Sequence, residues 1–335
     1  MSFRRRLLLP IFITVTTFCS LMMPLASADY SERPEVQQFI AQLTDSDGFN
    51  GEALEAVFRQ ARYKQSIIDA ISRPAERVLK WEGYQDIFLT DLRLRQGIAF
   101  EVSHRDLFAK AEARWGVDRW IILAILGVET SYGRNKGRYR VIDALSTLAF
   151  DYPPRSKFFK KELRELFLLS REQDKPVADL LGSYAGAMGY GQFIPSSYRA
   201  YAVDFNDDAF IDIWEEPADA IASIANYLSV HGWQQASPVL KQLASPADIP
   251  AALLNRQLKP HVSAATLVKF GLEPALLSDI ESEVLLNPLK FEGKTGPEYW
   301  LGYPNFYVIT RYNHSRLYAM AIYQLSEQLR NEMNQ

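Results

Sequence analysis

The residue best placed to do chemistry is a single glutamate at the end of a strongly apolar stretch. Residues Trp120 to Val128 include no charged side chain, and Glu129 follows them directly. A helix without a polar face is expected to be buried. Burial disfavours the charged form of a carboxyl group, so we expect the pKa of Glu129 to be raised. A carboxyl group that keeps its proton near neutral pH can act as a general acid.

Glu129 also has a simpler interpretation. A glutamate at a helix end is usually solvated or paired with a nearby arginine, and Arg134 and Arg138 are near enough in sequence to pair with it. The local pattern alone favours this structural role. The surrounding residues do predict the limits of the helix, with Asp118 as the N-cap and the small or polar residues Thr130–Gly133 at its end.

A second stretch is suited to holding a ligand. Gly182–Tyr198 contains four glycines and three serines, and these alternate with large side chains. Small residues allow a ligand to approach the backbone, and aromatic faces suit sugar rings. A tightly packed turn between helices is an equally good interpretation of the same residues. The large side chains of the stretch are Tyr184, Met188, Tyr190, Phe193 and Tyr198.

A third stretch, Asp204–Glu215, has the spacing of an EF-hand calcium loop. Oxygen-bearing side chains recur at alternate positions, and the carbonyl of Phe210 falls where such loops use a backbone ligand. The sixth position, normally glycine, is Ala209. An acidic surface loop is the alternative to a metal site. The side chains that the spacing selects are Asp204, Asn206, Asp208, Asp212 and Glu215.

The elements that must position these residues are mainly helices. Apolar residues recur at helical spacing before the apolar stretch, and Pro74 interrupts this run. Trp81–Gln85 is interpreted as an aromatic loop. Val284–Phe291 and Tyr299–Tyr312 are rich in aromatic and branched residues, which favours strands. The expected helices cover residues 36–43, 54–58, 67–71, 91–116, 120–129, 156–173, 219–232 and 315–333.

The N-terminal residues have the pattern of a signal peptide. Arg4–Arg6 precede the apolar residues Leu7–Leu25, and Ala26–Ala28 gives a small-x-small cleavage site. An uncleaved anchor is the alternative, since the apolar run is nearly long enough to span a bilayer. Cleavage after Ala28 removes three arginines and no acidic residue, so the formal charge falls from −3 to −6. An acidic protein is a poor partner for nucleic acid.

Cysteine usage adds two expectations. The only cysteine is Cys19, so the mature chain is expected to have no disulfide and no thiolate chemistry. A lipoprotein site requires a cysteine after small residues, and Cys19 follows Thr-Thr-Phe instead. We therefore expect a periplasmic monomer without a lipid anchor.

Taken together, the motifs resemble the lytic transglycosylase B family. VETSYGR at Val128–Arg134 is similar to the family's catalytic segment, and GAMGYGQFIPSSY at Gly186–Tyr198 is similar to its second core motif. The segments AVDFNDD, ANYLSVHGW and RYNHSRLYAMAI resemble the motifs that follow. The similar segments extend from Trp81 to Gln324 and are more specific together than singly.

The resemblance implies a mainly α fold, α+β overall. It implies a lysozyme-like helical core at 116–233 that contains the metal loop 204–219. A flanking helical domain would comprise 29–115, joined by the C-terminal helix 315–335. A small antiparallel β module would occupy 234–314 and contribute to the groove, after a signal peptide at 1–28.

The resemblance also implies the activity and the site. The implied reaction is cleavage of the β-1,4 bond between N-acetylmuramic acid and N-acetylglucosamine in peptidoglycan, with Glu129 as the catalytic residue. No catalytic cofactor is implied, but a structural calcium ion is, with Asp219 rather than Glu215 as the last ligand. The calcium ligands would be Asp204, Asn206, Asp208, the carbonyl of Phe210, and Asp219. The substrate-binding residues would be Tyr84, Arg155, Ser183, Met188, Tyr190, Gln192, Tyr312, Asn313 and Tyr318.

A single carboxyl group narrows the mechanism. Most glycosidases use two carboxylates, and Asp143 and Asp151 do not share the apolar setting of Glu129. One group suffices if the C6 hydroxyl of the substrate, not water, attacks C1 to give a 1,6-anhydro product. A hydrolytic muramidase of the same fold and a non-catalytic peptidoglycan-binding scaffold remain alternatives. Peptidoglycan strands, and possible other cell-wall enzymes, are the expected partners.

Overall fold

The computed structural model describes residues 29–72, 79–243, 249–278 and 280–334. The signal peptide expected at 1–28, including Cys19, and the break expected at Pro74 lie outside these ranges. The fold is mainly helical with small antiparallel sheets, as the sequence predicts. Within the described ranges, no helix combines the length and the apolar character needed to cross a membrane.

The apolar helix α6 (Arg119–Thr130) lies at the centre of the helical body. Every residue from Ile121 to Val128 is buried. Its first turn is capped as predicted, because the Asp118 carboxylate accepts a 2.9 Å hydrogen bond from the amide of Trp120. The C-terminal helix α13 (Arg316–Met333) packs along α6, and α5 (Asp91–Trp115) and α10 (Pro217–Val230) pack against it as well.

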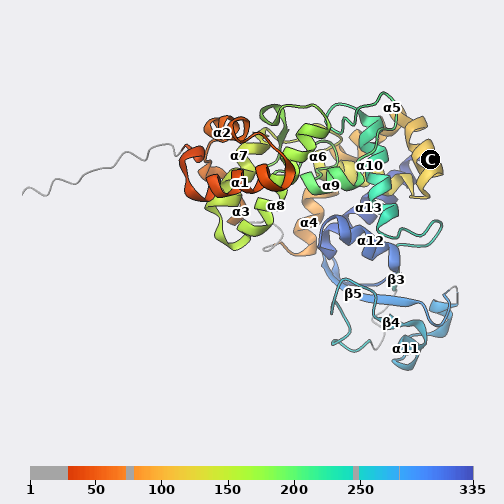
Figure 1. The fold of residues 1–335 in the computed structure, drawn as a ribbon. Coiled ribbons are helices and arrows are strands. Elements are labelled where there is room, and N and C mark those ends of the chain that lie inside the picture. The colour runs from red at the N-terminus through yellow and green to blue at the C-terminus, as the bar shows by residue number, and fades with distance from the viewer. Residues whose placement is uncertain (1–28, 73–78, 244–248, 279, 335) are drawn as a thin grey trace, which may run out of the picture.

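The remaining helices surround this centre, and one hydrophobic core runs through them from Tyr30 to Leu329. Figure 1 shows α1, α2, α3, α7 and α8 gathered at one end of the body, with α5 and α10 toward the other. The bounds of the helices not given elsewhere are α1 Pro34–Asp47, α2 Gly51–Gln60, α3 Gln65–Ser72, α7 Val141–Asp151, α8 Ser156–Glu172 and α9 Pro195–Tyr201.

A small sheet projects from the helical body (Figure 1). Its strands pair antiparallel in the order β3-β6-β5-β4. Ten residues around the sheet and α11 (Ala264–Lys269), among them Leu267, Leu286 and Leu301, form a separate core. The strand bounds are β3 Leu240–Leu243, β4 Val262–Ser263, β5 Leu285–Gly293 and β6 Gly296–Gly302. A two-stranded ribbon, β1 Tyr139–Arg140 with β2 Leu181–Gly182, lies in the helical body.

Two local predictions are wrong. The segment interpreted as an aromatic loop is the helix α4 (Trp81–Phe88), because Trp81, Tyr84 and Phe88 fall on one helical face and their rings contact one another. The second predicted strand, Tyr299–Tyr312, is a strand only over its first four residues. β6 ends at Gly302, and Pro304 begins helix α12 (Pro304–Tyr312), where proline fits the first turn and the apolar residues face the core at helical spacing.

Candidate functional site

Glu129 lies in the last turn of α6 and is half-buried. The hydroxyl of Tyr318, in the first turn of α13, donates a 2.6 Å hydrogen bond to Oε1 of Glu129. Tyr318 is itself 2% exposed. Burial, followed by the charge of Glu129, raises the pKa of Tyr318 well above its usual 10. The phenol therefore keeps its proton and remains a donor to the carboxylate.

Tyr312 brings a second motif to the same place. Its ring is stacked on that of Tyr318, with the centroids 6.5 Å apart and the planes 6° from parallel. Its hydroxyl donates a 2.5 Å hydrogen bond to the carbonyl of Gly191, within the glycine-rich stretch. The charge of Glu129 helps to raise the pKa of Tyr312, after burial. Residues from three distant motifs thus meet at Glu129.

Tyr84 completes this cluster from α4. It is 2% exposed, and, after burial and the charge of Glu129, it is among the groups that raise the pKa of Tyr318. Because this segment is a helix and not a loop, the ring of Tyr84 lies between those of Trp81 and Phe88 and contacts both. Asn313 lies immediately after α12, and its carbonyl accepts a hydrogen bond from the amide of Ser315, which caps α13.

The backbone after Glu129 is strained. Ser131 and Tyr132 both have positive φ, 50° and 60°, and Gly133 follows at 84°. Non-glycine residues adopt this conformation at a cost of about 1–3 kcal/mol each. The Tyr132 ring fits between two glycines, since a Cβ on Gly97 or Gly127 would lie 2.3 or 2.6 Å from its hydroxyl oxygen. This packing fixes the end of α6 and hence the direction of Glu129.

Two residues that the sequence analysis did not select connect the motifs. The hydroxyl of Thr130 donates to the carbonyl of Tyr190 at 2.9 Å and accepts from the amide of Gly133. The ammonium of Lys136 lies 5.0 Å from the centroid of the Tyr190 ring and pairs with Glu215 at 2.9 Å. Short-range pattern could not have identified either residue, because Tyr190 and Glu215, the partners that connect the motifs, are more than fifty residues away in sequence.

The glycine-rich stretch is a folded turn beside this cluster. The amide of Ser183 donates to the carbonyl of Ala187, and the side-chain hydroxyl of Ser183 accepts from the amide of Ala187. Met188 is fully buried, so it shapes the turn from within. Gln192, at φ 51°, donates to the carbonyls of Lys136 and Gly189. The interpretation as a tightly packed turn is therefore confirmed, and the turn lies beside Glu129; that it holds a ligand stays a prediction.

Arg155 lies apart from these residues. It is exposed in the short turn before α8, and its guanidinium packs on the rings of Phe158 and Phe159, 4.3 and 5.1 Å from their centroids. These contacts place it at the end of the molecule where α7 and α8 meet (Figure 1). The cluster around Glu129 does not include it.

Backbone amides of the acidic loop donate hydrogen bonds to carboxylates of the same loop. Asp204 accepts from the amides of Asp208 and Ala209, and Asp208 accepts from the amide of Phe210. Asp219 is fully buried and accepts from the amides of Phe205 and Asp212, at 2.8 and 2.7 Å. Glu215 points elsewhere, toward Lys136, with its side chain 75% exposed. Ala209 has φ 74°, which explains why such loops prefer glycine there.

The acidic loop contains oxygen-bearing side chains of the kind that hard cations prefer, but they do not form a complete coordination sphere. Burial, and then the charges of Asp204 and Asp208, raise the pKa of Asp219 despite its two amide donors. This mutual repulsion shows an excess of negative charge that a cation would offset. In the described part of the chain, however, no three acidic, histidine or cysteine side chains converge as a metal-binding group.

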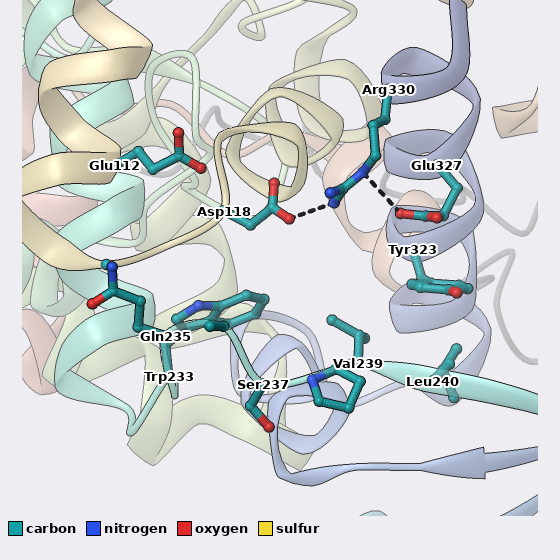
Figure 2. Close-up of a pocket in the computed structure, with 13 residues that line it drawn as sticks. Glu112, Asp118, Trp233, Gln235, Ser237, Val239, Leu240, Tyr323, Glu327 and Arg330 are labelled. Atoms are coloured by element: carbon teal, nitrogen blue, oxygen red, sulfur yellow. Dashed lines mark hydrogen bonds and ion pairs between the residues drawn. The ribbon is translucent and has the colours of Figure 1, made fainter. Parts of the chain in front are cut away.

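A cavity of about 560 Å³ lies at the opposite end of α6 from Glu129. Figure 2 shows its walls, with Trp233 below Asp118, and Tyr323 and Glu327 on α13. Its charges are mutually satisfied, because Arg330 pairs with both Asp118 and Glu327, and Glu112 pairs with Arg119 at 3.3 Å. About 11 residues of helix at 1.5 Å each separate Asp118 from Glu129, so this cavity is distinct from the cluster above.

Comparison with known proteins shows similarity over almost the whole described chain. The model of the family described as "Transglycosylase SLT domain" matches residues 31–327. The membrane-bound lytic murein transglycosylase B of Escherichia coli K12 is 40% identical over 309 residues, which cover 89% of this chain and 83% of that protein.

Solved structures have the same fold. The soluble lytic transglycosylase SltB1 from Pseudomonas aeruginosa is 47% identical, with a TM-score of 0.84, and the match covers 90% of this chain and 100% of that one. The Escherichia coli lytic transglycosylase Slt35, solved in complex with calcium, is 37% identical, with a TM-score of 0.83 over 92% of this chain and 96% of that one.

Proposed function

Because this chain belongs to the lytic transglycosylase B family, which carries the SLT domain, we propose that it cleaves the β-1,4 bond between N-acetylmuramic acid and N-acetylglucosamine in peptidoglycan. Glu129 serves as the only acid and base, and the product ends in 1,6-anhydromuramic acid. The family membership makes the protein a lytic transglycosylase. What we propose is which bond is cleaved, which residues act on it and by which mechanism.

The observation that carries the proposal is the hydrogen bond from Tyr318 to Glu129. It holds one carboxyl oxygen of a half-buried glutamate in a fixed direction, next to the glycine-rich turn. A purely structural glutamate at a helix end would be solvated or paired with arginine. Arg134, one of the two arginines near Glu129 in sequence, donates to the carbonyl of Ser131. The contact to Tyr318 therefore favours the catalytic role.

The other two carboxylates considered from the sequence are committed elsewhere. Asp143 is buried and bound by Arg140 and by the amide of Arg62. Asp151 is bound by Tyr30 and Arg33. Neither can serve as the second carboxylate that an ordinary glycosidase needs. This supports a mechanism in which one carboxyl group performs both proton transfers.

The reaction follows from that single group. Glu129 gives its proton to the glycosidic oxygen as the bond to C1 of the muramic residue breaks, and the N-acetylglucosamine leaves with a hydroxyl group. The substrate's own N-acetyl group stabilises the positive charge at C1. The Glu129 carboxylate then removes the proton of the C6 hydroxyl, and that oxygen bonds to C1. The ring closes and the acid is restored.

The chain's other residues position the sugar. Tyr84 and Tyr318 are buried and would act by fixing the groups around Glu129, while the partly exposed Tyr312 would contact the sugar. Ser183, Tyr190 and Gln192 would contact it from the glycine-rich turn. Met188 supports that turn from inside. Asn313 follows Tyr312 directly, and Arg155 contacts the glycan or its peptide at a more distant position. Holding C6 against C1 replaces a bimolecular attack by water with a unimolecular one.

A calcium ion is a structural component of the proposal. Asp204, Asn206, Asp208, the carbonyl of Phe210 and Asp219 would hold it, and it would neutralise the charge that raises the pKa of Asp219. The buried position of Asp219 and the outward direction of Glu215 support Asp219 as the last ligand. The similar Slt35 was solved with calcium. No step of the reaction involves the ion.

The proposed setting is the periplasm, where the protein acts as a monomer on glycan strands after removal of residues 1–28. A hydrolytic muramidase of the same fold would use the same glutamate but admit water. A scaffold protein that only binds peptidoglycan would not need the Glu129–Tyr318 contact.

The variant Glu129→Gln tests the assignment. Glutamine keeps the size of the side chain and can still accept from Tyr318, but it carries no transferable proton. We expect unchanged folding and binding of isolated peptidoglycan, with cleavage reduced to background. Residual activity above a small fraction, in a variant with the melting temperature of the native protein, would show that another group is the acid.

A further inference from the structure

Three lysines share one face of α8. Lys157, Lys160 and Lys161 are spaced by three and four residues, and Arg164 extends the same row, so the four charges lie along about 10 Å of helix. They border a surface cavity of about 670 Å³ whose lining contains no carboxylate. Phe39, Gln42, Pro153 and Ser156 complete that lining. We call this surface the basic face of α8.

The carboxylates around the basic face are paired with arginines or turned into the core. Glu35 pairs with Arg33 at 2.6 Å, and Asp47 pairs with Arg164 at 2.5 Å. Glu165 pairs with Arg164 and Arg199. Glu162 turns away from the face and is buried against Ser196.

The three lysines, in contrast, have no ion pair among the described residues. Lys160 lies over the ring of Phe150, 5.3 Å from its centroid, and its charge helps to lower the pKa of Glu35 after stronger effects, chiefly hydrogen bonds and the charge of Arg33. The net positive charge of the face therefore comes from Lys157, Lys160 and Lys161. This local positive charge is opposite in sign to the formal charge of the protein, which is −3 for the full sequence and −6 without residues 1–28.

The basic face lies beside the first described residues. Phe150, which Lys160 covers, also contacts the ring of Tyr30 at 6.0 Å. Tyr30 is held there by its 2.6 Å hydrogen bond to Asp151. The apolar residues 7–25 precede this point by only a few residues. The basic face is therefore close in space to the point where the described chain begins.

We propose that the basic face of α8 docks the protein on a membrane surface of anionic phospholipid headgroups. A row of lysines matches a flat array of phosphates better than it matches one small ligand, and each lysine near such a surface strengthens binding about fivefold. Phe39 and Pro153 give the cavity an apolar floor at the same level. The proposal concerns location only and does not depend on the reaction at Glu129.

Docking would be reversible and sensitive to salt. Exposed charges interact over about 10 Å at ordinary ionic strength and less at high salt. Three lysines are too few for permanent anchoring, so the protein would exchange between the membrane and the glycan strands. Glu129 lies on α6 and is not part of this face.

The test is vesicle binding of the exported protein, purified from the periplasm with its N-terminus determined by mass spectrometry. One set of vesicles contains equal parts of phosphatidylcholine and phosphatidylglycerol, and the other contains phosphatidylcholine alone. We expect binding to the mixed vesicles only, with release by salt. The triple variant K157Q/K160Q/K161Q should bind them on the order of 100-fold more weakly while keeping its activity on soluble glycan strands.

A matched control has the same loss of charge elsewhere. Lys110, Lys259 and Lys269 are exposed and lie outside the basic face, so K110Q/K259Q/K269Q should bind like the native protein. Equal weakening in both triple variants would overturn the proposal, because net charge alone would then explain binding. Unchanged binding of K157Q/K160Q/K161Q would overturn it too. The double variant K157Q/K161Q changes only exposed residues, and it should show the same effect in part if the triple variant is unstable.

Peptidoglycan supplies the remaining comparison. The membrane proposal is wrong if the native protein does not bind the mixed vesicles. If the triple variant then binds peptidoglycan with intact peptides more weakly, but binds peptide-free glycan as the native protein does, the ligand of the basic face is the carboxylates of the peptides. Failure of the proposed reaction would appear separately, as a native protein that docks on vesicles but does not cleave peptidoglycan.

Discussion

The hydroxyl of Tyr318 donates a 2.6 Å hydrogen bond to the carboxylate of Glu129 across 189 residues of sequence. The two residues lie at the end of α6 and the start of α13, helices that pack along each other through the centre of the molecule. The contact therefore couples the rigidity of the core directly to the direction of the proposed acid. The carboxyl group of Glu129 has a fixed direction because α13 packs against α6 and brings Tyr318 within hydrogen-bond distance.

Replacing Tyr318 with phenylalanine tests this coupling. The ring remains, but the hydrogen bond to a charged group, worth about 1.5–3 kcal/mol, is lost. We expect kcat to fall about 10- to 100-fold with KM nearly unchanged. Tyr323→Phe, five residues along the same helix and at the other cavity, is the control and should retain full activity. An equal loss in both variants would remove the special role of Tyr318.

The pH profile gives an independent view of the same residue. The pKa of Tyr318 is raised well above 10 by burial and by the charge of Glu129, so the phenol keeps its proton at every pH at which the protein is used. Any decline of the native activity below pH 10 should therefore also be present in Tyr318→Phe. If the substitution does remove an alkaline limb from the kcat profile, Tyr318 is ionising and its donor role is wrong.

Gly97 tests the support of Glu129 from the other side. A methyl group at this position would lie 2.3 Å from the hydroxyl oxygen of Tyr132, within the strained turn that follows Glu129. Gly97→Ala should lower the free energy of unfolding by about 1–3 kcal/mol and reduce kcat as well. Gly51→Ala is the matched control, because its nearest neighbour would be an ordinary 3.5 Å away. Denaturant unfolding and kinetics check both, and an active, stable Gly97→Ala would contradict this packing.

Calcium should raise the melting temperature, since a ligand that binds only the folded state stabilises it. We expect a chelator to lower the melting temperature of the native protein and to have no effect on Asp204→Ala. Asp219→Asn should be more damaging than Glu215→Gln, because Asp219 is buried with two amide donors while Glu215 makes one exposed ion pair. Identical melting curves with and without calcium would leave an acidic surface loop and no metal site.

Much of this architecture was predictable from local sequence. The cap at Asp118, the buried helix ending at Glu129 and the breaks at turns follow from side-chain chemistry within a few residues. The two wrong predictions, at Trp81–Gln85 and over the second half of Tyr299–Tyr312, share one cause. Aromatic and branched residues suit strands, loops and buried helices alike, and only the tertiary packing of α4 and α12 decides among them.

The candidate site was predictable only in its separate parts. The motifs that contain Glu129, Tyr190 and Tyr318 were each visible, yet their distances depend on how α6 and α13 pack. Lys136 and Thr130 gave no signal, because a lysine and a threonine are ordinary at a helix end until Tyr190 is known to lie against them. Pairing of residues far apart in sequence is the part that local pattern does not contain.

The measurement that tests the central claim most directly is mass spectrometry of the products formed from purified peptidoglycan in heavy-oxygen water. If Glu129 is the only acid and base and the C6 hydroxyl attacks C1, the products end in 1,6-anhydromuramic acid. They are then lighter by one water than hydrolysis products, carry no new reducing end and contain no heavy oxygen. Products with reducing ends that carry the label would contradict the transglycosylase mechanism and identify the protein as a hydrolytic muramidase.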